Sequence, residues 1–523
     1  MILPSRDRFP SAVLAGLLLW GKPVVGDEPL RFSGQTGPSV VQVVANLDDD
    51  DQDGQPDGSD DVINGLTDEA DLSPLTITSA DPLIEVIRLQ LDTAAVRCFA
   101  RNDQAWRLLE PDAEVVLRDG EAELLLECRS FASAAPGWNG HAVLAAVGLG
   151  AAGEQRARTA IEVRVAPVEL VDETRRVNEV YVARGRYDNE TFITELAAVL
   201  AGLNVPLTLH DATTWQEMWM QDTMELAVTK VDASAQQPAR RMTVVLSGLR
   251  GVDPFPQSLL GPDVAVAQIA LPRKLTGGDG WADWYGNLMA SPPTRQWPHG
   301  RVIAGRNTST GTGFHPDALD FLESQQAQSP IWIDTSWLLI KHVDEILAFL
   351  PGPDGSGVLL APDPLAGLKL AEAAELPVAT GSTAKPLADA NRLVAALIDD
   401  ILLGSDTFAR AGGVTPGQAN GLLELLGWDE ERVVRLPVAF APPQGWVPGQ
   451  ALTNAEALWS NPINMLCVDG TVICGATNMP EAVMKVCREQ FARGGAARVV
   501  FIDDACYHRA KGNIHCGTNA RRE

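Results

Sequence analysis

The feature that most constrains the fold of this 523-residue chain is a dense run of carboxylates between residues 46 and 71. Its acidic members are Asp48, Asp49, Asp50, Asp51, Asp53, Asp57, Asp60, Asp61, Asp68, Glu69 and Asp71. Carboxylates this close repel one another unless positive charge lies among them. Calcium takes six to eight oxygen ligands and suits a flexible acidic loop, so the run predicts a calcium site. A solvated acidic linker is the alternative, because charge runs usually face water.

One register of this loop matches the ligand spacing of an EF-hand, with Asp at the final position. That register consists of Asp49, Asp51, Asp53, Gly54, Asp57 and Asp60. An EF-hand places its loop between two helices, whereas residues 39–46 are short and β-branched and predict a strand. The loop is therefore not an EF-hand.

The residues from 28 to about 170 alternate short apolar runs with turns. These runs lie at 39–46, 83–89, 113–117, 122–127 and 160–165. Short strands at this spacing are typical of a β-sandwich. Pro167 and the charged run 172–176 predict a boundary between this unit, 28–170, and a second unit, 175–523.

The first 27 residues have the layout of a secretory signal. Arg6 and Arg8 precede an apolar run at 11–20, and small residues follow before Asp27. This layout slightly favours a secreted or periplasmic protein, with a cytoplasmic protein as the alternative. The run is too short to span a bilayer, and no other run approaches that length, so no membrane span is expected.

The second unit alternates predicted strands and helices. Strands are expected at 178–183 and 498–502, and helices at 189–201, 367–375 and 384–402. The alternation predicts an α/β class, although the sequence shows no clear internal repeat.

Composition narrows the partners. The net charge of −27 argues against a nucleic-acid partner, because phosphate binding needs a basic face, and favours cationic substrates or bound cations. The seven cysteines contain no CxxC pair, and the seven histidines form no HExxH pair, which disfavours zinc. The oligomeric state stays open.

Three short motifs far apart in the chain carry residue types of nucleophilic catalysis. They are Trp-Met-Gln-Asp at 219–222, His-Val-Asp-Glu at 342–345 and His-Cys-Gly-Thr-Asn at 515–519. Taken singly, each has an ordinary structural interpretation: a helix cap, a core histidine or a buried thiol. Taken in order, they resemble the calcium-dependent protein-arginine deiminases. Further matching stretches are Arg-Gly at 250–251, Phe-Pro at 255–256, Gly-Pro-Asp at 261–263, Tyr-Gly-Asn-Leu at 285–288 and Ile-Asn-Met-Leu at 463–466.

The resemblance implies an α/β fold, a five-bladed propeller (pentein) over 175–523, preceded by an immunoglobulin-like β-sandwich. It implies Ca²⁺ as cofactor and a second ligand register for the acidic loop. That register is Asn46, Asp48, Asp50, Asp57, Asp60, Asp68 and Asp71, with Asp263 from the second unit. Another calcium is expected on Gln221 and Glu225 with the carbonyl oxygens of Tyr285 and Leu288. Thr223 and Met289 replace acidic ligands of the relatives, so the number of ions stays open.

The expected reaction is hydrolysis of arginine side chains in proteins or peptides to citrulline and ammonia. Two carboxylates, Asp222 and Asp344, suit the planar fork of a guanidinium. Cys516 is the expected nucleophile, forming a covalent thiouronium, and His342 the acid–base group. Gly517, which follows the nucleophile, leaves room for close backbone approach.

Four other residues complete the expected site. Trp219 is expected to pack against the aliphatic stem of the arginine, and Arg250 to hydrogen-bond the peptide backbone. His515 is expected to point elsewhere, because it only neighbours Cys516 along the chain. Ala510 stands where vertebrate relatives have an arginine, so substrate preference is expected to differ.

Two alternatives remain open. One is a deiminase of small guanidines such as free arginine or agmatine. The other is a calcium-binding or adhesion protein without catalysis, which the presence of Cys516, His342, Asp222 and Asp344 disfavours.

Overall fold

The computed structural model describes residues 29–33, 40–102, 105–134, 137–185, 188–214, 216–233, 238–249, 254–275, 277–307, 310–404 and 420–523. The signal-like segment 1–27 and the predicted substrate residue Arg250 lie outside these ranges. In the part of the chain that is described, no helix has both the length and the apolar character that crossing a bilayer requires.

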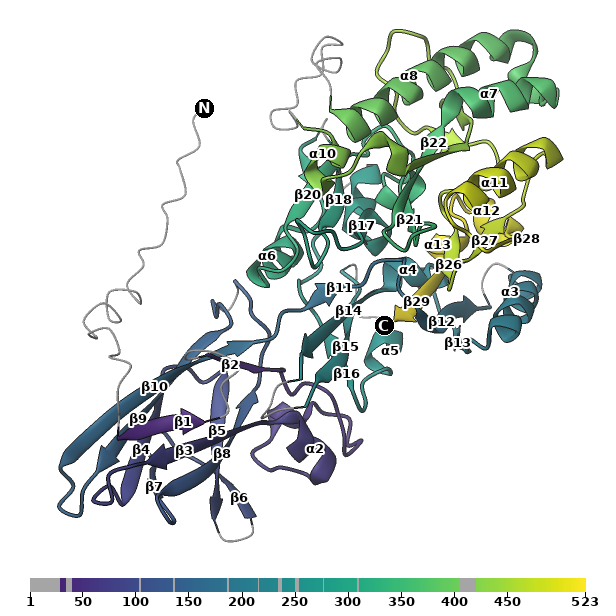
Figure 1. Cartoon of the computed structure of the whole chain (residues 1–523). Coiled ribbons are helices and arrows are strands. Elements are labelled where there is room, and N and C mark those ends of the chain that lie inside the picture. Colours follow the sequence, from purple (N-terminus) through teal and green to yellow (C-terminus); the bar gives the residue numbers. More distant parts are fainter. Residues whose placement is uncertain are drawn as a thin grey trace.

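The first ten described strands form two five-stranded sheets, in the orders β1-β3-β8-β5-β6 and β2-β10-β9-β4-β7. Their bounds are β1 Leu30–Ser33, β2 Val40–Val43, β3 Ser73–Ser79, β4 Val86–Leu91, β5 Val96–Asn102, β6 Ala105–Leu108, β7 Glu114–Val116, β8 Glu121–Cys128, β9 His141–Leu149 and β10 Gln155–Val165. Apolar residues from both sheets, such as Ile77 of β3 and Leu144 of β9, belong to one buried core. The predicted strands of this unit are confirmed. Figure 1 shows them gathered at one end of an elongated molecule.

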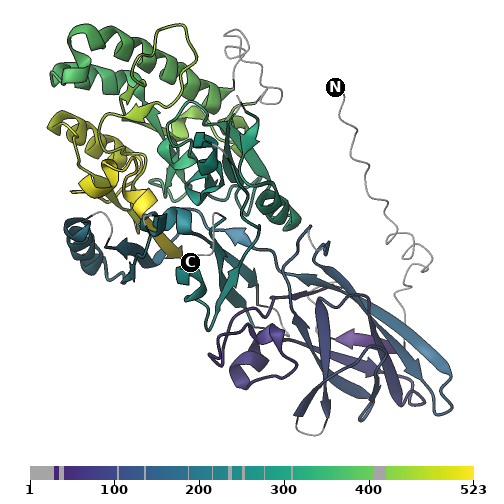
Figure 2. The ribbon, with the colours of Figure 1, turned by 180° about the vertical axis from the view of Figure 1, so that it is seen from behind.

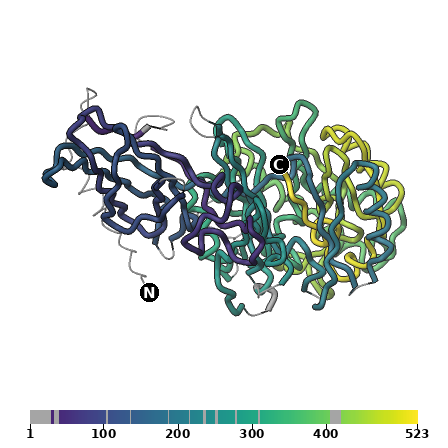
Figure 3. The backbone as a smooth tube through the Cα atoms, turned by 90° about the horizontal axis from the view of Figure 1, so that it is seen from below, coloured from purple at the N-terminus to yellow at the C-terminus, as the bar shows by residue number. Residues whose placement is uncertain are grey.

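The acidic loop connects β2 to β3 and contains η1 (Asp57–Ser59) and α2 (Leu66–Asp71). It lies against the second unit, because the amide of Asp263 donates to Asp48 Oδ2 at 2.9 Å and Arg240 donates to the carbonyl of Leu72. A strand precedes the loop, as the sequence predicts. The tube view in Figure 3 shows this purple segment between the two units.

The second unit contains sheets in which strand directions are mixed. Their strands are β11 Glu169–Leu170, β12 Val177–Arg184, β13 Leu207–Asp211, β14 Met224–Val231, β15 Arg240–Ser247, β16 Val264–Ala267, β17 Leu288–Ala290, β18 Val302–Asn307, β19 Thr312–Gly313, β20 Pro330–Asp334, β21 Ala348–Leu350, β22 Val358–Asp363, β23 Val433–Pro437, β24 Phe440–Ala441, β25 Glu456–Ala457, β26 Leu466–Val468, β27 Thr471–Gly475, β28 Arg498–Ile502 and β29 Thr518–Arg522. Helices lie between them, so this unit is α/β (Figures 1 and 2).

Among the described residues, five of these sheets repeat one pairing pattern. A central strand pairs antiparallel on one side and parallel on the other: β12 with β29 and β13, β15 with β14 and β16, β18 with β17 and β20, β22 with β21 and β23, and β27 with β26 and β28. The sequence shows no corresponding repeat, because the five sheets have the same strand directions but different amino-acid sequences.

The helices predicted from the sequence are confirmed as α3 (Glu190–Leu203), α7 (Pro364–Ala373) and α8 (Ala384–Leu403). At the start of α7 the Asp363 side chain accepts from the amide of Ala366 at 2.9 Å, which caps the helix. The other helices are α4 Met220–Thr223, α5 Pro254–Gln257, α6 Pro316–Ser324, α10 Leu422–Leu426, α11 Glu481–Arg493, α12 Ala505–His508 and α13 Ile514–Gly517. The short 3₁₀ turns are η2 Gln216–Met218, η3 Gly277–Asp283, η4 Tyr285–Asn287, η5 Val343–Glu345, η6 Pro377–Ala379, η7 Gly381–Thr383 and η8 Glu430–Arg432.

Candidate active site

Cys516 lies in the one-turn helix α13, directly before strand β29, and only 8% of it is exposed. The side chain of Asn464 holds it twice: Nδ2 donates to Sγ at 3.2 Å, and Oδ1 accepts from the Cys516 amide at 3.2 Å. A Cβ added to Gly517 would lie 2.4 Å from the ring of Tyr507. Close approach at the residue after the cysteine therefore requires glycine, as predicted.

Asp344 lies in the turn η5 and is 1% exposed. Its Oδ2 is 3.6 Å from Cys516 Sγ. Its Oδ1 is buried and has no hydrogen-bond partner among the described residues. A buried carboxylate oxygen without a partner is costly, so this atom is suited to receive a ligand donor.

Asp222 reaches the same place from the short helix α4. Its Oδ1 accepts from the amide of Gly286 at 3.0 Å and lies 3.9 Å from Nδ1 of His342. Burial raises the pKa of Asp222 to about 6, and the neighbouring Asp344 charge adds to that rise. An added cation would favour the ionised form of both acids.

His342 immediately precedes η5 and is 1% exposed. Its Nε2 lies 2.8 Å from the carbonyl oxygen of Trp281, which can only accept, so Nε2 carries a proton. Its Nδ1 has no hydrogen-bond partner in the described part of the chain. The imidazole is thus held at one nitrogen and available for proton exchange at the other.

Gly286 marks the point where these groups meet. A Cβ added there would lie 2.6 Å from His342 Nδ1 and 3.1 Å from both Asp222 Oδ1 and Asp344 Oδ2. The absent side chain lets the backbone at Gly286 approach two carboxylates and an imidazole closely. Two carboxylates brought together in this way suit the charge of a planar cation.

A cavity of about 300 Å³ opens beside Cys516. Apolar side chains such as Leu339 and Leu458 line it, and the Lys511–Glu456 ion pair, 2.6 Å long, lies among the lining residues. Trp219 is buried, and a Cβ on Gly512 would be 2.3 Å from its ring and 3.2 Å from Cys516 Cβ. Trp219 and the cysteine therefore both pack closely against Gly512, which lines the cavity, whereas Trp219 does not.

The Cys516 thiol is protonated in the free protein. Burial raises its pKa well above the usual value, and the charges of Asp344 and Asp222 raise it further. A cation bound between those two acids would oppose the second effect and favour the thiolate.

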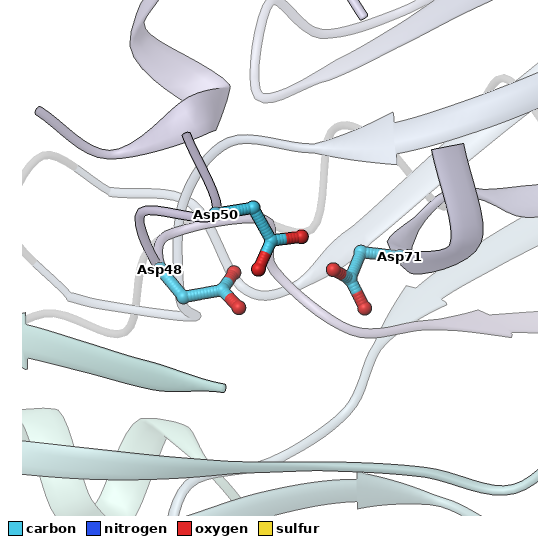
Figure 4. A group of neighbouring side chains, drawn as sticks. All are labelled: Asp48, Asp50 and Asp71. Atoms are coloured by element: carbon cyan, nitrogen blue, oxygen red, sulfur yellow. The ribbon is translucent and has the colours of Figure 1, made fainter. Parts of the chain in front are cut away.

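The acidic loop brings only part of its predicted ligand set together. Carboxylate oxygens of Asp48, Asp50 and Asp71 lie within 4.8 Å of one another, and Figure 4 shows these side chains turned toward a common space. Burial and mutual repulsion raise the pKa of Asp48 to about 6 and that of Asp71 to about 8. Such a set of repelling oxygens, buried at Asp48 and half-buried at Asp50 and Asp71, fits an oxygen-preferring cation.

The remaining predicted loop ligands contact this group or one another, and Asp57 Oδ2 accepts from the amide of Asp50 at 2.8 Å. Asn46 donates to Asp68 at 2.9 Å, and Asp60 accepts from the amide of Val62 at 2.8 Å. Asp57 groups with Asp49 and Asp51, which belong to the EF-hand register. Asp263 contacts Asp48 through its amide.

The second predicted calcium site coincides with a small cavity of about 40 Å³. Gln221, Glu225 and Leu288 line it, together with the apolar Met289. Gln221 Nε2 donates to Glu225 Oε2 at 2.8 Å, and burial raises the pKa of Glu225 to about 8. Tyr285 is not among the lining residues.

Comparison with known proteins decides the family. A family model described as protein-arginine deiminase matches residues 156–523. The chain belongs to this family. It is 30% identical over 387 residues to protein-arginine deiminase type-4 of Rattus norvegicus, covering 69% of this chain and 55% of that protein. Over 386 residues it is 29% identical to human type-4 and human type-1, covering 69% of this chain and 54% and 55% of those proteins.

The chain thus spans about half the length of the curated relatives it matches. Among solved structures, agmatine deiminases of C. jejuni and Enterococcus faecalis align over 68% of this chain and 96% of theirs. The TM-scores are 0.37 and 0.38 and the identities 9% and 13%, too distant to support an inference.

One prediction about the site is wrong. His515 was expected to point elsewhere, but its Nδ1 lies 2.9 Å from Asp344 Oδ2. Three more residues of the site carry no local signal of a role: Asn464 at the thiol, Gly286 at the centre and Glu173 beside His515. Asn464 and Gly286 fall in stretches that resemble the family, whereas Glu173 falls in the charged run that marked only a boundary.

Proposed function

We propose that this chain hydrolyses the guanidinium group of arginine residues in proteins or peptides, giving citrulline and ammonia. Membership of the family supports this activity. The single observation that carries it is the convergence of Asp222, Asp344 and His342 at Gly286, from segments far apart in the chain, with Cys516 Sγ 3.6 Å from Asp344.

In the proposed complex the guanidinium lies between the two acids. Asp222 and Asp344 accept its N–H groups and balance its charge, which a buried cation requires. Their fixed positions hold the central carbon of the guanidinium near Cys516, whose sulfur is 3.6 Å from Asp344. The aliphatic stem of the arginine would then reach the cavity beside Cys516. Trp219, which does not line that cavity, remains its predicted packing partner.

The covalent steps follow from these positions. The bound cation lowers the pKa of the thiol, which loses its proton to solvent, and the thiolate bonds to the guanidinium carbon. His342, protonated on Nδ1, gives that proton to the departing nitrogen as the C–N bond breaks, leaving a thiouronium and ammonia. The imidazole next accepts a proton from water as the water oxygen bonds to the carbon. The C–S bond then breaks, the second proton of the added water passes to solvent, citrulline leaves, and the thiolate is regenerated.

Calcium is the proposed cofactor, held in the loop by Asp48, Asp50 and Asp71 and near α4 by Gln221 and Glu225. The crowded carboxylates of the loop and the buried carboxyl of Glu225 support such a cation. When bound, it would supply positive charge that neutralises repelling acids. The other predicted ligands remain Asn46, Asp57, Asp60, Asp68, Asp263 and the carbonyls of Tyr285 and Leu288.

The proposal extends to the architecture. Five sheets with one shared pairing pattern support a five-bladed propeller over 175–523. Two sheets around one core support an immunoglobulin-like sandwich over 28–170. Arg250 stays the predicted contact to the peptide backbone.

A citrulline colour assay tests the activity. An N-blocked arginine ester is incubated with the protein across a calcium titration, with chelator and with Cys516→Ser as controls. Citrulline from the wild type alone, and only with calcium, is expected. No citrulline at any calcium concentration would rule the activity out. Equal rates on free and N-blocked arginine would favour a deiminase of small guanidines instead.

A further inference from the structure

His515 lies between two carboxylates. Its Nδ1 is 2.9 Å from Asp344 Oδ2, and its Nε2 is 3.1 Å from Glu173 Oε1. The side chains are 13% exposed for His515, 2% for Asp344 and 12% for Glu173. The three therefore form a chain of charge-assisted hydrogen bonds that is largely shielded from water.

The two contacts require a protonated imidazole. A neutral imidazole has one N–H, and an ionised carboxylate can only accept, so two carboxylate partners need both ring nitrogens to carry protons. His515 is then a fixed positive charge between two negative ones. The chain of three has a net charge of −1, which leaves Asp344 able to attract a second cation.

Glu173 is itself fixed in place. It lies between β11 and β12, and its Oε2 accepts from the amide of Phe349 in β21 at 2.7 Å. Its carbonyl oxygen accepts from Arg522 Nη1 at 2.9 Å. Phe349 follows the turn that carries Asp344, and Arg522 ends the strand that follows Cys516. Glu173 therefore links the segment that carries Asp344 to the segment that carries Cys516.

The geometry at Asp344 shows what this arrangement does. His515 takes Oδ2, whereas Oδ1 is buried without a partner among the described residues. An aspartate carboxylate rotates broadly about its last torsion. A donor fixed on one oxygen sets that torsion and so fixes the position of the other oxygen.

We propose that His515 is a positioning residue for the deimination: anchored by Glu173, it holds the Asp344 carboxylate in the orientation that receives the substrate guanidinium. This inference rests on the proposed function, because it assigns Asp344 to guanidinium binding. His515 acts through Asp344 and does not itself touch the reacting atoms.

Loss of the imidazolium has two opposing effects on cation binding. It removes the fixed orientation, which weakens binding, and it removes a positive charge, which strengthens binding. The lost hydrogen bond to a charged acceptor is expected to outweigh the lost charge. His515→Asn and His515→Gln both remove that charge, so a difference in Kd between them reports orientation alone.

Three substitutions separate the two hydrogen bonds. Asparagine carries its amide nitrogen near the position of imidazole Nδ1, and glutamine carries it near Nε2. His515→Asn therefore keeps the donor to Asp344, His515→Gln keeps the donor to Glu173, and His515→Ala keeps neither. His141→Ala is the matched control, since it breaks another histidine–glutamate pair, at 2.7 Å to Glu162, in the N-terminal sheets.

Binding is measured by calorimetry in the Cys516→Ala background with N-blocked arginine amide and saturating calcium. We expect the Kd to rise about 10- to 100-fold in His515→Ala and His515→Gln, the range for a lost hydrogen bond to a charged group. His515→Asn should stay within about fivefold, and His141→Ala should not change. With Cys516 intact, KM should rise by the same factors while kcat changes less, whereas partial unfolding would lower kcat alone.

Two results would overturn the inference: a Kd for His515→Ala within about threefold of the parent, or equal losses in His515→Asn and His515→Gln. These differ from failure of the proposed function, which is absence of citrulline from the wild type. If the Cys516→Ala parent binds no arginine amide either, Asp344 is not a guanidinium site and both ideas fail.

Discussion

Gly286→Ala gives the sharpest test of the site, because it adds one methyl group at the point where the reacting side chains meet. The φ angle of Gly286 is not in the left-handed region, so alanine brings no backbone strain. The new Cβ would lie 2.6 Å from His342 Nδ1, whereas an ordinary contact begins near 3.4 Å. The imidazole must therefore retreat by about 0.8 Å, and the methyl also takes the space within 3.1 Å of Asp222 and Asp344.

A misplacement of about 1 Å at a reacting group can lower a rate about 100-fold. We therefore expect kcat/KM for N-blocked arginine to fall at least about 100-fold, or about 2.7 kcal/mol of transition-state stabilisation. Folding should survive, because overpacking costs about 1–3 kcal/mol, partly offset by the roughly 0.4–1 kcal/mol that alanine gains over glycine in the unfolded chain. Citrulline formation and thermal unfolding measure the two effects separately.

Gly202→Ala is the matched control. Gly202 is exposed in helix α3, and a Cβ there meets nothing within 4 Å. It should keep its kcat/KM and gain about 0.5–1 kcal/mol of stability. If Gly286→Ala retained kcat/KM within about threefold of wild type, the guanidinium would not lie where Asp222, Asp344 and His342 converge.

Four further outcomes are expected. Because the pKa of the Cys516 thiol is raised in the free protein, neutral iodoacetamide should label it slowly at pH 7.5 and faster above pH 9. A cationic haloacetamidine should label it about 100-fold faster than iodoacetamide at pH 7.5, and equal rates for the two reagents would contradict the paired acids. Burial raises the pKa of Asp222 to about 6, and only the ionised acid binds a cation. The value of kcat/KM should therefore rise with pH up to about 6, whereas a rise already complete near pH 4 would contradict this assignment. Asp71→Asn should raise the calcium concentration for half-maximal activity at least about tenfold, whereas the exposed Asp53→Asn should not; equal shifts would favour the EF-hand register. Burial would raise the pKa of Glu217, but hydrogen bonds from the preceding turn lower it to about 2. An acid with a lowered pKa stabilises the fold at pH values above its unfolded-state pKa of about 4.5, and this stabilisation is lost as the pH falls toward 2. Glu217→Gln should therefore lower the free energy of unfolding by about 1–3 kcal/mol at pH 7 and by almost nothing near pH 2, as measured by denaturant unfolding.

The regular elements could be predicted because their signals are local. Strands of the first unit follow from short β-branched runs, and α7 and α8 from helix-forming runs. The cap at Asp363 starts α7 three residues earlier than expected. The fivefold repeat of sheet pairing could not be predicted, since it depends on which strands pair and in which direction. Pairing is set by contacts between distant segments.

The acidic loop shows the same division. Its density of carboxylates predicts a cation site without any structure, because such charges cannot lie together uncompensated. The choice of neighbours is tertiary: α2 turns Asp71 back toward Asp48 and Asp50, while Asp57 groups with members of the other register. Spacing along an irregular loop does not determine which oxygens share a space.

By itself the sequence determined the residue types of the site, since a guanidinium calls for two acids, a nucleophile and a proton carrier, and three ordered motifs contain them. Only the tertiary structure decided that His515 joins the site. Adjacent residues of a helix point about 100° apart, which predicts that a neighbour of Cys516 faces away from it. Asp344 lies between the two, with one oxygen 3.6 Å from the sulfur and 2.9 Å from the imidazole, and Glu173 closes the arrangement from 342 residues earlier in the chain.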